Sequence, residues 1–193
     1  MVKLIGVNKT NTSVFISGNG TNLKNLIKFS KTHNSPIKIN IVISNKKNAQ
    51  GIKYAKKNKI KIQIIDFSKK SEINRLLKIL KFNNIKLICL AGFLRILSKY
   101  FIKSFKGKII NIHPSLLPRY KGLNTHERVL KKNEKFTGCS VHFVNEKLDG
   151  GKIILQKKIK IFKKDDVKSL KNRVLKEEYK LYPKSIIKIF SNL

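Results

Sequence analysis

Residues 13–22 read Ser-Val-Phe-Ile-Ser-Gly-Asn-Gly-Thr-Asn, a short apolar run that ends near two glycines and leads into a helical pattern. An apolar run of this length, closed by glycine, is typical of a buried strand in a parallel sheet. The same alternation continues along the chain, with strands predicted at 37–43, 61–65, 86–91 and 108–112 and helices at 21–32, 49–58 and 72–82. Strands that alternate with helices predict an α/β fold: a Rossmann-like, mostly parallel sheet with helices on both faces.

The alternation changes after residue 112. A loop rich in Pro and Gly covers 113–123, and it is followed by a short helix near 125–132 and by strands at 137–144 and 152–162. The chain closes on an amphipathic helix over 166–190, in which Pro183 is a candidate break. Because no repeat or low-complexity linker interrupts the chain, we expect a single domain over 1–193. It comprises an N-terminal extension (1–12), a phosphate-binding half (13–110) and a catalytic half (111–193).

The chain is strongly basic, with a formal net charge of +34. Only five of its 44 basic residues are arginine, and the lysines are spread along the sequence together with many Ile and Asn residues. Because Lys, Ile and Asn share A/T-rich codons, a biased genome produces this composition without selection for binding. A nucleic-acid-binding protein would instead cluster its cations among aromatic residues, so no specific nucleic-acid partner is expected. A positive field would still draw an anionic substrate to a cleft.

Two cysteines, Cys89 and Cys139, stand in apolar or small-residue surroundings, and their spacing suits neither a metal site nor a redox pair. We expect two reduced, buried thiols and no metal. No apolar stretch approaches the roughly 20 residues of a membrane helix, and the first 13 residues contain no apolar signal core. These features predict a cytoplasmic protein without a membrane partner.

The turn Gly18-Asn19-Gly20-Thr21-Asn22 lies where the first predicted strand enters the first predicted helix. Glycine allows positive φ and close approach of backbone N–H groups to a ligand, and the N-terminus of a helix attracts anions. Thr21 is a candidate N-cap. Leu23 stands where a dinucleotide-binding turn has its third glycine, so a monophosphate suits this site better than a pyrophosphate. A tight turn without a ligand is the alternative.

Asn111-Ile112-His113-Pro114 is the most informative stretch for chemistry, since it follows the strand predicted at 108–112. Residues 111 and 113 point to the same side of an extended chain, at the carboxyl end of a strand, where open α/β sheets place their sites. The Asn111 amide can polarise a carbonyl, and His113 can stabilise an oxyanion or transfer a proton. Asp149 precedes Gly150-Gly151 and is by itself compatible with an ordinary turn.

Together, these motifs resemble the phosphoribosylglycinamide formyltransferases, a family of folate-dependent formyltransferases. The resemblance spans about residues 14–183 and is carried by the following segments: Ile16–Leu23, Leu90–Leu97, Asn111–Pro118, Gly122–His126, Ser140–Phe143 and Asp149–Gly151. It implies a formyltransferase fold whose second half binds folate as well as carrying the catalytic residues. It also implies a cis peptide bond before Pro118, and it leaves the choice between monomer and dimer open.

The resemblance further implies a role for each matching residue. Asn111, His113 and Asp149 match the catalytic residues of the family. The other roles are phosphate binding by Gly20, Thr21 and Asn22, contact with the substrate amine side by Glu178, and folate binding by Leu94, Arg95, Ile96, Leu97, Asn111 and Val144. The implied reaction moves the formyl group of 10-formyltetrahydrofolate, a co-substrate, to the amine of glycinamide ribonucleotide in de novo purine (IMP) biosynthesis.

In the implied reaction the substrate amine attacks the formyl carbon directly, Asn111 and protonated His113 stabilise the oxyanion, and Asp149 assists proton transfer. Two departures from the family pattern are Lys121, where proline is usual, and Asn124, where histidine is common. The alternatives are an enzyme like methionyl-tRNA formyltransferase or formyltetrahydrofolate hydrolase, each of which is expected to carry an additional domain, or a basic nucleic-acid-binding protein.

Overall fold

The computed structural model describes residues 9–191. Within this range, residues 9–95 and 103–108 form one compact unit, and residues 96–102 and 109–191 form the other. The two units carry different parts of the chemistry that the sequence predicts. The turn at 18–22 belongs to the first unit, whereas Asn111, His113 and Asp149 all belong to the second.

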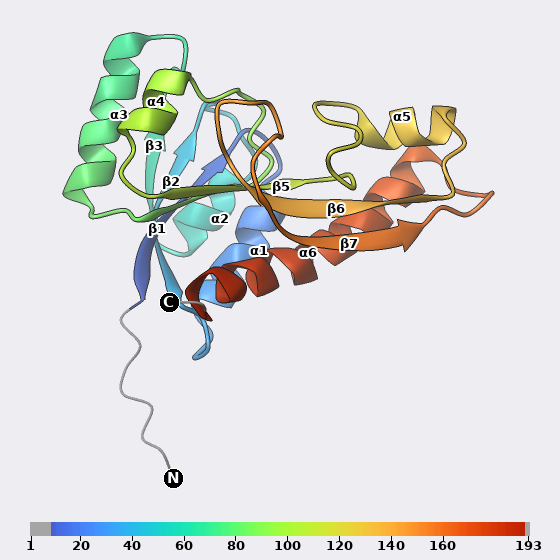
Figure 1. Cartoon of the computed structure of the whole chain (residues 1–193). Helices are drawn as coiled ribbons and strands as arrows, with labels where there is room; N and C mark the ends of the chain where they lie inside the picture. The colour runs from blue at the N-terminus through green and yellow to red at the C-terminus, as the bar shows by residue number, and fades with distance from the viewer. Residues whose placement is uncertain (1–8, 192–193) are drawn as a thin grey trace. The chain divides into compact units, whose positions relative to one another are not determined.

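The first unit is built on a parallel sheet with the strand order β3-β2-β1-β4 (Figure 1). Its strands are β1 (Thr10–Ile16), β2 (Ile37–Ser44), β3 (Lys61–Ile64) and β4 (Leu87–Leu90), and its helices are α1 (Thr21–Ser30), α2 (Ile52–Lys57) and α3 (Lys70–Phe82). The chain moves outward from β1 to β3 and then returns to β4. Right-handed crossovers therefore place α1 and α2 on one face of the sheet and α3 on the other.

The core of the first unit explains why these segments are strands and helices. Val14 and Phe15 of β1 point to opposite faces of the sheet and both are fully buried, as an uninterrupted apolar run requires. Helix α3 buries Ile73, Leu76 and Leu80, which recur at helical spacing. Each such side chain contributes about 1.5–3 kcal/mol through burial, so the amphipathic pattern is sufficient to fix the helix against the sheet.

The second unit contains the antiparallel ladder β5-β6-β7 and the long helix α6. Its elements are β5 (Lys108–His113), α5 (Thr125–Lys131), β6 (Phe136–Phe143), β7 (Ile153–Lys160) and α6 (Val167–Ser191); the first residue of β5 belongs to the other unit. Helix α6 packs along β6 and β7 and also contacts α5 (Figure 1). From α6, the fully buried Tyr182 donates its hydroxyl proton to the Ile110 carbonyl in β5, at 3.2 Å.

The α/β class, the mostly parallel sheet and the helices on both faces are confirmed, while some boundaries differ from the predictions. Strand β1 begins at Thr10 rather than at residue 13. Helix α6 continues through Pro183 without a break. A short helix, α4 (Lys99–Ser104), was not predicted, because six residues with the single buried side chain Phe101 give no readable period.

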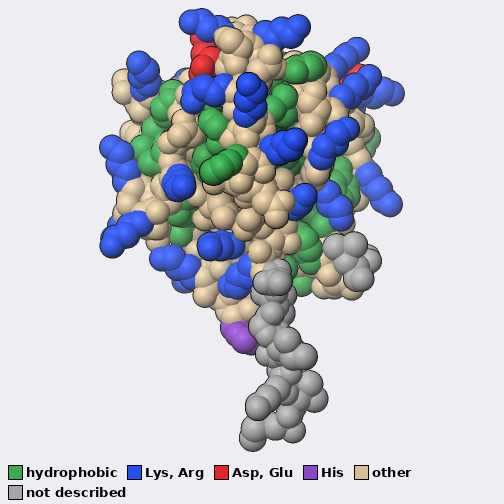
Figure 2. All heavy atoms as spheres, turned by 90° about the vertical axis from the view of Figure 1, so that its left-hand side faces the viewer, with side chains coloured by type: hydrophobic (Ala, Val, Ile, Leu, Met, Phe, Trp, Pro, Cys, Tyr) green, Lys and Arg blue, Asp and Glu red, His purple; other side chains and the backbone are tan. Residues whose placement is uncertain are grey.

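Lysine and arginine side chains are distributed over the face drawn in Figure 2 rather than gathered in one patch. This distribution agrees with the spread of lysine along the sequence.

Among residues 9–191, no helix has the length and apolar character needed to cross a membrane.

Candidate active site

The turn between β1 and α1 depends on a glycine at position 20. Gly20 has φ of +69° and is the N-cap of α1, so Thr21 is the first helical residue and the prediction that Thr21 caps the helix is wrong. A side chain at position 20 would also collide with the Cα atom of Gly51, whose N–H donates to the Gly18 carbonyl at 2.9 Å. The backbone at the start of α1 is thus held in one conformation, and the N-terminus of this helix suits an anion.

We expect Gly20→Ala to destabilise the protein by about 2–4 kcal/mol, because it combines an unfavourable positive φ with a backbone collision. Gly18→Ala is the matched control, since a Cβ atom at Gly18 meets no atom within 4 Å. Urea denaturation of both variants measures the difference. Equal stabilities would contradict this account of the turn.

Residues 92–97 expose two large apolar side chains after β4. Gly92 accepts a hydrogen bond from the Ser17 N–H at 3.1 Å, and the Leu94 N–H donates to Ser17 Oγ at 2.8 Å, which ties this segment to the end of β1 in the first unit. Leu94 is 59% exposed; in the second unit, Ile96 is 75% exposed, while Leu97 is buried. Exposed apolar side chains of this size are suited to cover an aromatic ligand.

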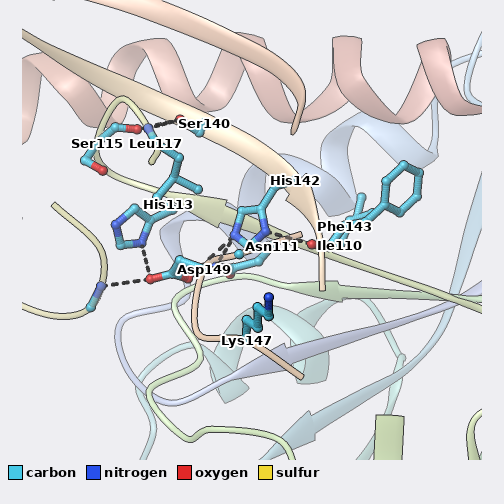
Figure 3. Close-up of polar contacts among 12 residues, drawn as sticks. Ile110, Asn111, His113, Ser115, Leu117, Ser140, His142, Phe143, Lys147 and Asp149 are labelled. Carbon is cyan, nitrogen blue, oxygen red and sulfur yellow. Dashed lines mark hydrogen bonds and ion pairs between the residues drawn. The ribbon is translucent and has the colours of Figure 1, made fainter. Parts of the chain in front are cut away.

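The second unit brings Asn111, His113 and Asp149 together (Figure 3). Asn111 and His113 project from β5, and Asp149 comes from the loop between β6 and β7. His113 Nδ1 lies 3.4 Å from Asp149 Oδ2, and Asn111 Nδ2 lies 3.5 Å from Asp149 Oδ1. Asp149, which the sequence alone left compatible with an ordinary turn residue, is therefore the centre of this cluster.

The carboxylate of Asp149 is held by its backbone and by several donors. The residue has φ of +43°, and its Oδ2 accepts a hydrogen bond from the Gly122 N–H at 2.8 Å. A side chain at position 151 would collide with the Phe143 carbonyl, so Gly151 allows the loop to close tightly behind Asp149. Burial raises the pKa of Asp149, but the contacts with His142 and with the Gly122 N–H and the nearby imidazoles outweigh burial, and the pKa lies below its usual value.

His142 is part of this cluster, although the sequence prediction did not place it among the site residues. Its Nδ1 lies 2.8 Å from the Phe143 carbonyl, so we assign the proton to Nδ1. Its Nε2 lies 3.3 Å from Asn111 Nδ2 and 3.6 Å from Asp149 Oδ1. The available signal was the cross-strand register, since Asn111 pairs directly with His142 in the β5–β6 ladder.

His113 is buried, and each of its ring nitrogens faces an oxygen. Its Nε2 lies 2.8 Å from the Tyr120 carbonyl, which can only accept, so Nε2 carries a proton. Burial lowers the pKa of His113, and the Tyr120 carbonyl and Asp149 raise it only in part. The lowered pKa favours the neutral ring, and because Nε2 carries a proton, Nδ1 is the nitrogen left to gain or lose one.

The loop after His113 is anchored by buried hydrogen bonds and has a cis Leu117–Pro118 bond, as the resemblance implied. Ser140 Oγ accepts from the Leu117 N–H at 3.0 Å and donates to the Ser115 carbonyl at 2.6 Å. The side chain of Gln156 donates to the Leu117 carbonyl at 2.9 Å. These bonds connect the loop to β6 and β7.

Val144 and Glu178 occupy separate places in the second unit. Val144 is half-buried directly after β6, where its N–H donates to the Ile109 carbonyl at 2.8 Å. Glu178 is buried on α6. Both cysteines are buried free thiols, and burial, with the charge of Glu178, raises the pKa of Cys139. Among residues 9–191, no group of three or more His, Cys, Asp or Glu side chains is arranged to hold a metal ion.

His126 should make the stability of the protein depend on pH. Burial, with the charges of Lys171 and His113, lowers its pKa from 6.5 to about 4. As the pH falls, the unfolded chain takes up this proton before the folded chain does. The stabilising contribution is therefore complete above pH 6.5 and is lost progressively as the pH falls to about 4.

We expect His126→Gln to reduce this loss of stability by roughly 1–3 kcal/mol, a range that allows for partial solvent screening. Urea denaturation at pH 7 and at pH 4.5 measures the change. The control is His33→Gln, because His33 is exposed. The same pH dependence in the wild type and in His126→Gln would contradict the expectation.

Comparison with known proteins now decides the family. Residues 10–186 match the formyl transferase family. The chain belongs to this family. Phosphoribosylglycinamide formyltransferase of Haemophilus influenzae is 42% identical over 183 residues, which cover 93% of this chain and 86% of that protein. The resemblance inferred from the motifs is thereby confirmed.

Other relatives of this formyltransferase include a longer protein and solved structures. The trifunctional purine biosynthetic protein adenosine-3 of Gallus gallus is 41% identical over 94% of this chain, which spans only 18% of the length of that protein. The crystal structure of phosphoribosylglycinamide formyltransferase from Anaplasma phagocytophilum superposes with a TM-score of 0.89 at 37% identity, covering 96% of this chain and 88% of that chain. These likenesses extend over nearly the whole chain.

Proposed function

We propose that this chain transfers the formyl group of 10-formyltetrahydrofolate to the amine of glycinamide ribonucleotide, a step of de novo purine biosynthesis. The observation that carries the proposal is the cluster of Asn111, His113 and Asp149, gathered around one buried carboxylate in a member of the formyl transferase family. The relatives named phosphoribosylglycinamide formyltransferase support the choice of acceptor.

Binding of the two substrates is assigned mainly to residues outside the cluster in this proposal. The backbone at Gly20, Thr21 and Asn22 holds the phosphate, since the start of a ten-residue helix with a fixed turn suits an anion. Glu178 lies toward the amine side of the acceptor. The folate contacts are assigned to Leu94, Arg95, Ile96, Leu97, Asn111 and Val144. The exposed side chains of Leu94 and Ile96 fit an aromatic ring.

Proton transfer is the task of His113 and Asp149. As the amine attacks the formyl carbon, it must lose a proton, and N10 of the folate must gain one before it leaves. In this proposal His113 accepts the proton at Nδ1, since Nε2 is engaged by the Tyr120 carbonyl, and Asp149, 3.4 Å from Nδ1, stabilises the imidazolium that forms. His113 then returns the proton to N10. The low pKa of Asp149 keeps its carboxylate ionised throughout.

Asn111 stabilises the negative charge that develops on the formyl oxygen. Its amide nitrogen lies 3.3 Å from His142 Nε2 and 3.5 Å from Asp149 Oδ1, both long for hydrogen bonds. An oxyanion at normal hydrogen-bond distance would be the better acceptor, so this donor is available when charge develops.

The choice of acceptor can be tested with purified protein and 10-formyltetrahydrofolate in three parallel reactions, with glycinamide ribonucleotide, with initiator methionyl-tRNA and with water alone. We expect tetrahydrofolate to form rapidly only with glycinamide ribonucleotide. Turnover with methionyl-tRNA alone would favour a tRNA formyltransferase, and release of formate without an acceptor would indicate a hydrolase. Either result would overturn the proposed acceptor.

A further inference from the structure

Tyr120 has an unfavourable backbone conformation that requires stabilising contacts. Its φ of +55° lies in the left-handed region, which a tyrosine rarely occupies. In this conformation its carbonyl oxygen accepts the Nε2 proton of the buried His113 at 2.8 Å. The backbone of Tyr120 therefore determines which nitrogen of His113 remains available for chemistry.

The side chain of Tyr120 is held by three charged groups. Its hydroxyl donates to Glu134 Oε1 at 2.6 Å, and Arg119 forms an ion pair with the same carboxylate. The ring has the guanidinium carbon of Arg119 and that of Arg128 each 5.4 Å from its centroid. Arg128 also donates to the Lys121 carbonyl at 2.6 Å, so the peptide that follows Lys121 is constrained as well.

Glu134 supplies a fixed point for these contacts. It lies in the short connection between α5 and β6, and its N–H donates to the Val129 carbonyl at 3.1 Å. Both elements that it joins belong to the packed second unit, since α5 contacts α6 and β6 lies in the middle of the β5-β6-β7 ladder. A carboxylate anchored in this way can hold Tyr120 against the fold.

We propose that Tyr120 and Glu134 are positioning residues for His113: through the Tyr120 hydroxyl, Glu134 holds the Tyr120 carbonyl against Nε2 and so leaves Nδ1 directed at Asp149. The inference rests on the proposed function, because it assigns the working nitrogen of the proposed acid–base group. A histidine with one nitrogen engaged by a backbone carbonyl has a single tautomer and a single orientation. Neither Tyr120 nor Glu134 needs to touch a substrate.

The surroundings of these contacts make the inference testable without unfolding the protein. Arg119 is exposed, and Tyr120 and Glu134 are only partly buried. Ion pairs and hydrogen bonds at such positions contribute little to global stability. Tyr120→Phe removes one oxygen atom and retains the ring between its two arginines, while Glu134→Ala removes the acceptor. Glu134→Gln retains an oxygen that can accept from the hydroxyl.

The direct measurement is the ¹⁵N NMR spectrum of His113, which reports the tautomer in the absence of any substrate. In the wild type at neutral pH we expect a protonated Nε2 and an unprotonated Nδ1. Tyr120→Phe and Glu134→Ala should shift both signals toward those of exchanging tautomers, whereas Glu134→Gln should remain close to the wild type. Glu127→Gln, an exposed change on α5, is the matched control. Unchanged His113 signals in Tyr120→Phe and Glu134→Ala would overturn the proposal.

Activity gives a second measurement. We expect kcat to fall roughly 10- to 100-fold in Tyr120→Phe and Glu134→Ala with KM nearly unchanged, since a displaced catalytic group weakens chemistry more than binding. Glu134→Gln should restore most of kcat. A rise in KM alone would contradict a positioning role.

The pH dependence of kcat/KM provides a further test, because the Tyr120 carbonyl raises the pKa of His113. The groups that face His113 are Asp149, His142, Arg128 and His126, and none of them is altered in the two variants. In Tyr120→Phe and Glu134→Ala, the limb of the kcat/KM profile that reflects titration of His113 should therefore move to lower pH. If the protein lacks formyltransferase activity, the NMR result still decides whether Tyr120 and Glu134 position His113. Failure of the proposed function can therefore be distinguished from failure of the positioning proposal.

Discussion

Replacing Asp149 by asparagine is expected to reduce kcat by roughly 10²–10⁴-fold, the range that a positioned acid–base group contributes. The carboxylate faces His113, His142, Asn111 and the Gly122 N–H, so it is the one negative charge that all four groups of the cluster contact. Asparagine is nearly isosteric but carries no charge, and it cannot stabilise the imidazolium of His113. Steady-state rates with saturating substrates measure the loss.

The control for this variant is Asp66→Asn, which changes an exposed aspartate in the first unit. Its kcat should stay within about twofold of the wild type, as expected for a substitution at an exposed position. Circular dichroism and urea denaturation establish that Asp149→Asn is folded. A folded Asp149→Asn enzyme with a near-normal rate would remove Asp149 from the mechanism.

Asn111→Ala should reduce kcat by about 10²–10³-fold, as the loss of one oxyanion donor does in comparable sites. The amide is expected to act mainly when charge has developed on the formyl oxygen, so KM for either substrate should change much less. Rapid-quench single-turnover kinetics separate the chemical step from binding.

A second variant, Asn111→Asp, tests whether Asn111 acts as a hydrogen-bond donor or only fills space in the site. It retains the size of the side chain but replaces the N–H donors by a carboxylate beside Asp149, and like charges at this distance raise the pKa of both groups. We expect a loss at least as large as that of Asn111→Ala. If Asn111→Asp were nearly as active as the wild type, Asn111 would not be an oxyanion donor.

Much of the fold could be predicted because the apolar runs are regular. The first unit alternates strand and helix with clear periods, and α3 has the apolar spacing of an amphipathic helix. The glycine turn between the first strand and the first helix could also be predicted from the sequence. The assignment of the N-cap to Thr21 failed because a glycine in the left-handed conformation occupies that position and leaves Thr21 inside the first turn.

The candidate site was only partly readable. Asn111 and His113 could be paired by their spacing on one strand. Asp149 is 36 residues beyond His113 in sequence, and only the resemblance to a family joined it to them. His142 and Tyr120 were missed because their roles arise from the register of an antiparallel ladder and from a backbone carbonyl, which no residue pattern reveals.

The protonation of His113 is a further point that the sequence could not give. The resemblance implies a protonated imidazole, which stays a prediction, and burial lowers the pKa of His113 and so disfavours the charged form. The consequence for the proposed reaction is specific: His113 accepts a proton before it donates one.

The central claim is that this chain carries a formyl group from a folate to the amine of glycinamide ribonucleotide. The most direct measurement follows a ¹³C-labelled formyl group by NMR after mixing the purified protein with 10-[¹³C]formyltetrahydrofolate and glycinamide ribonucleotide. We predict that the label appears as a formamide carbon on the ribonucleotide, with tetrahydrofolate released in equal amount. Label recovered as free formate, or retained on the folate, would contradict the claim.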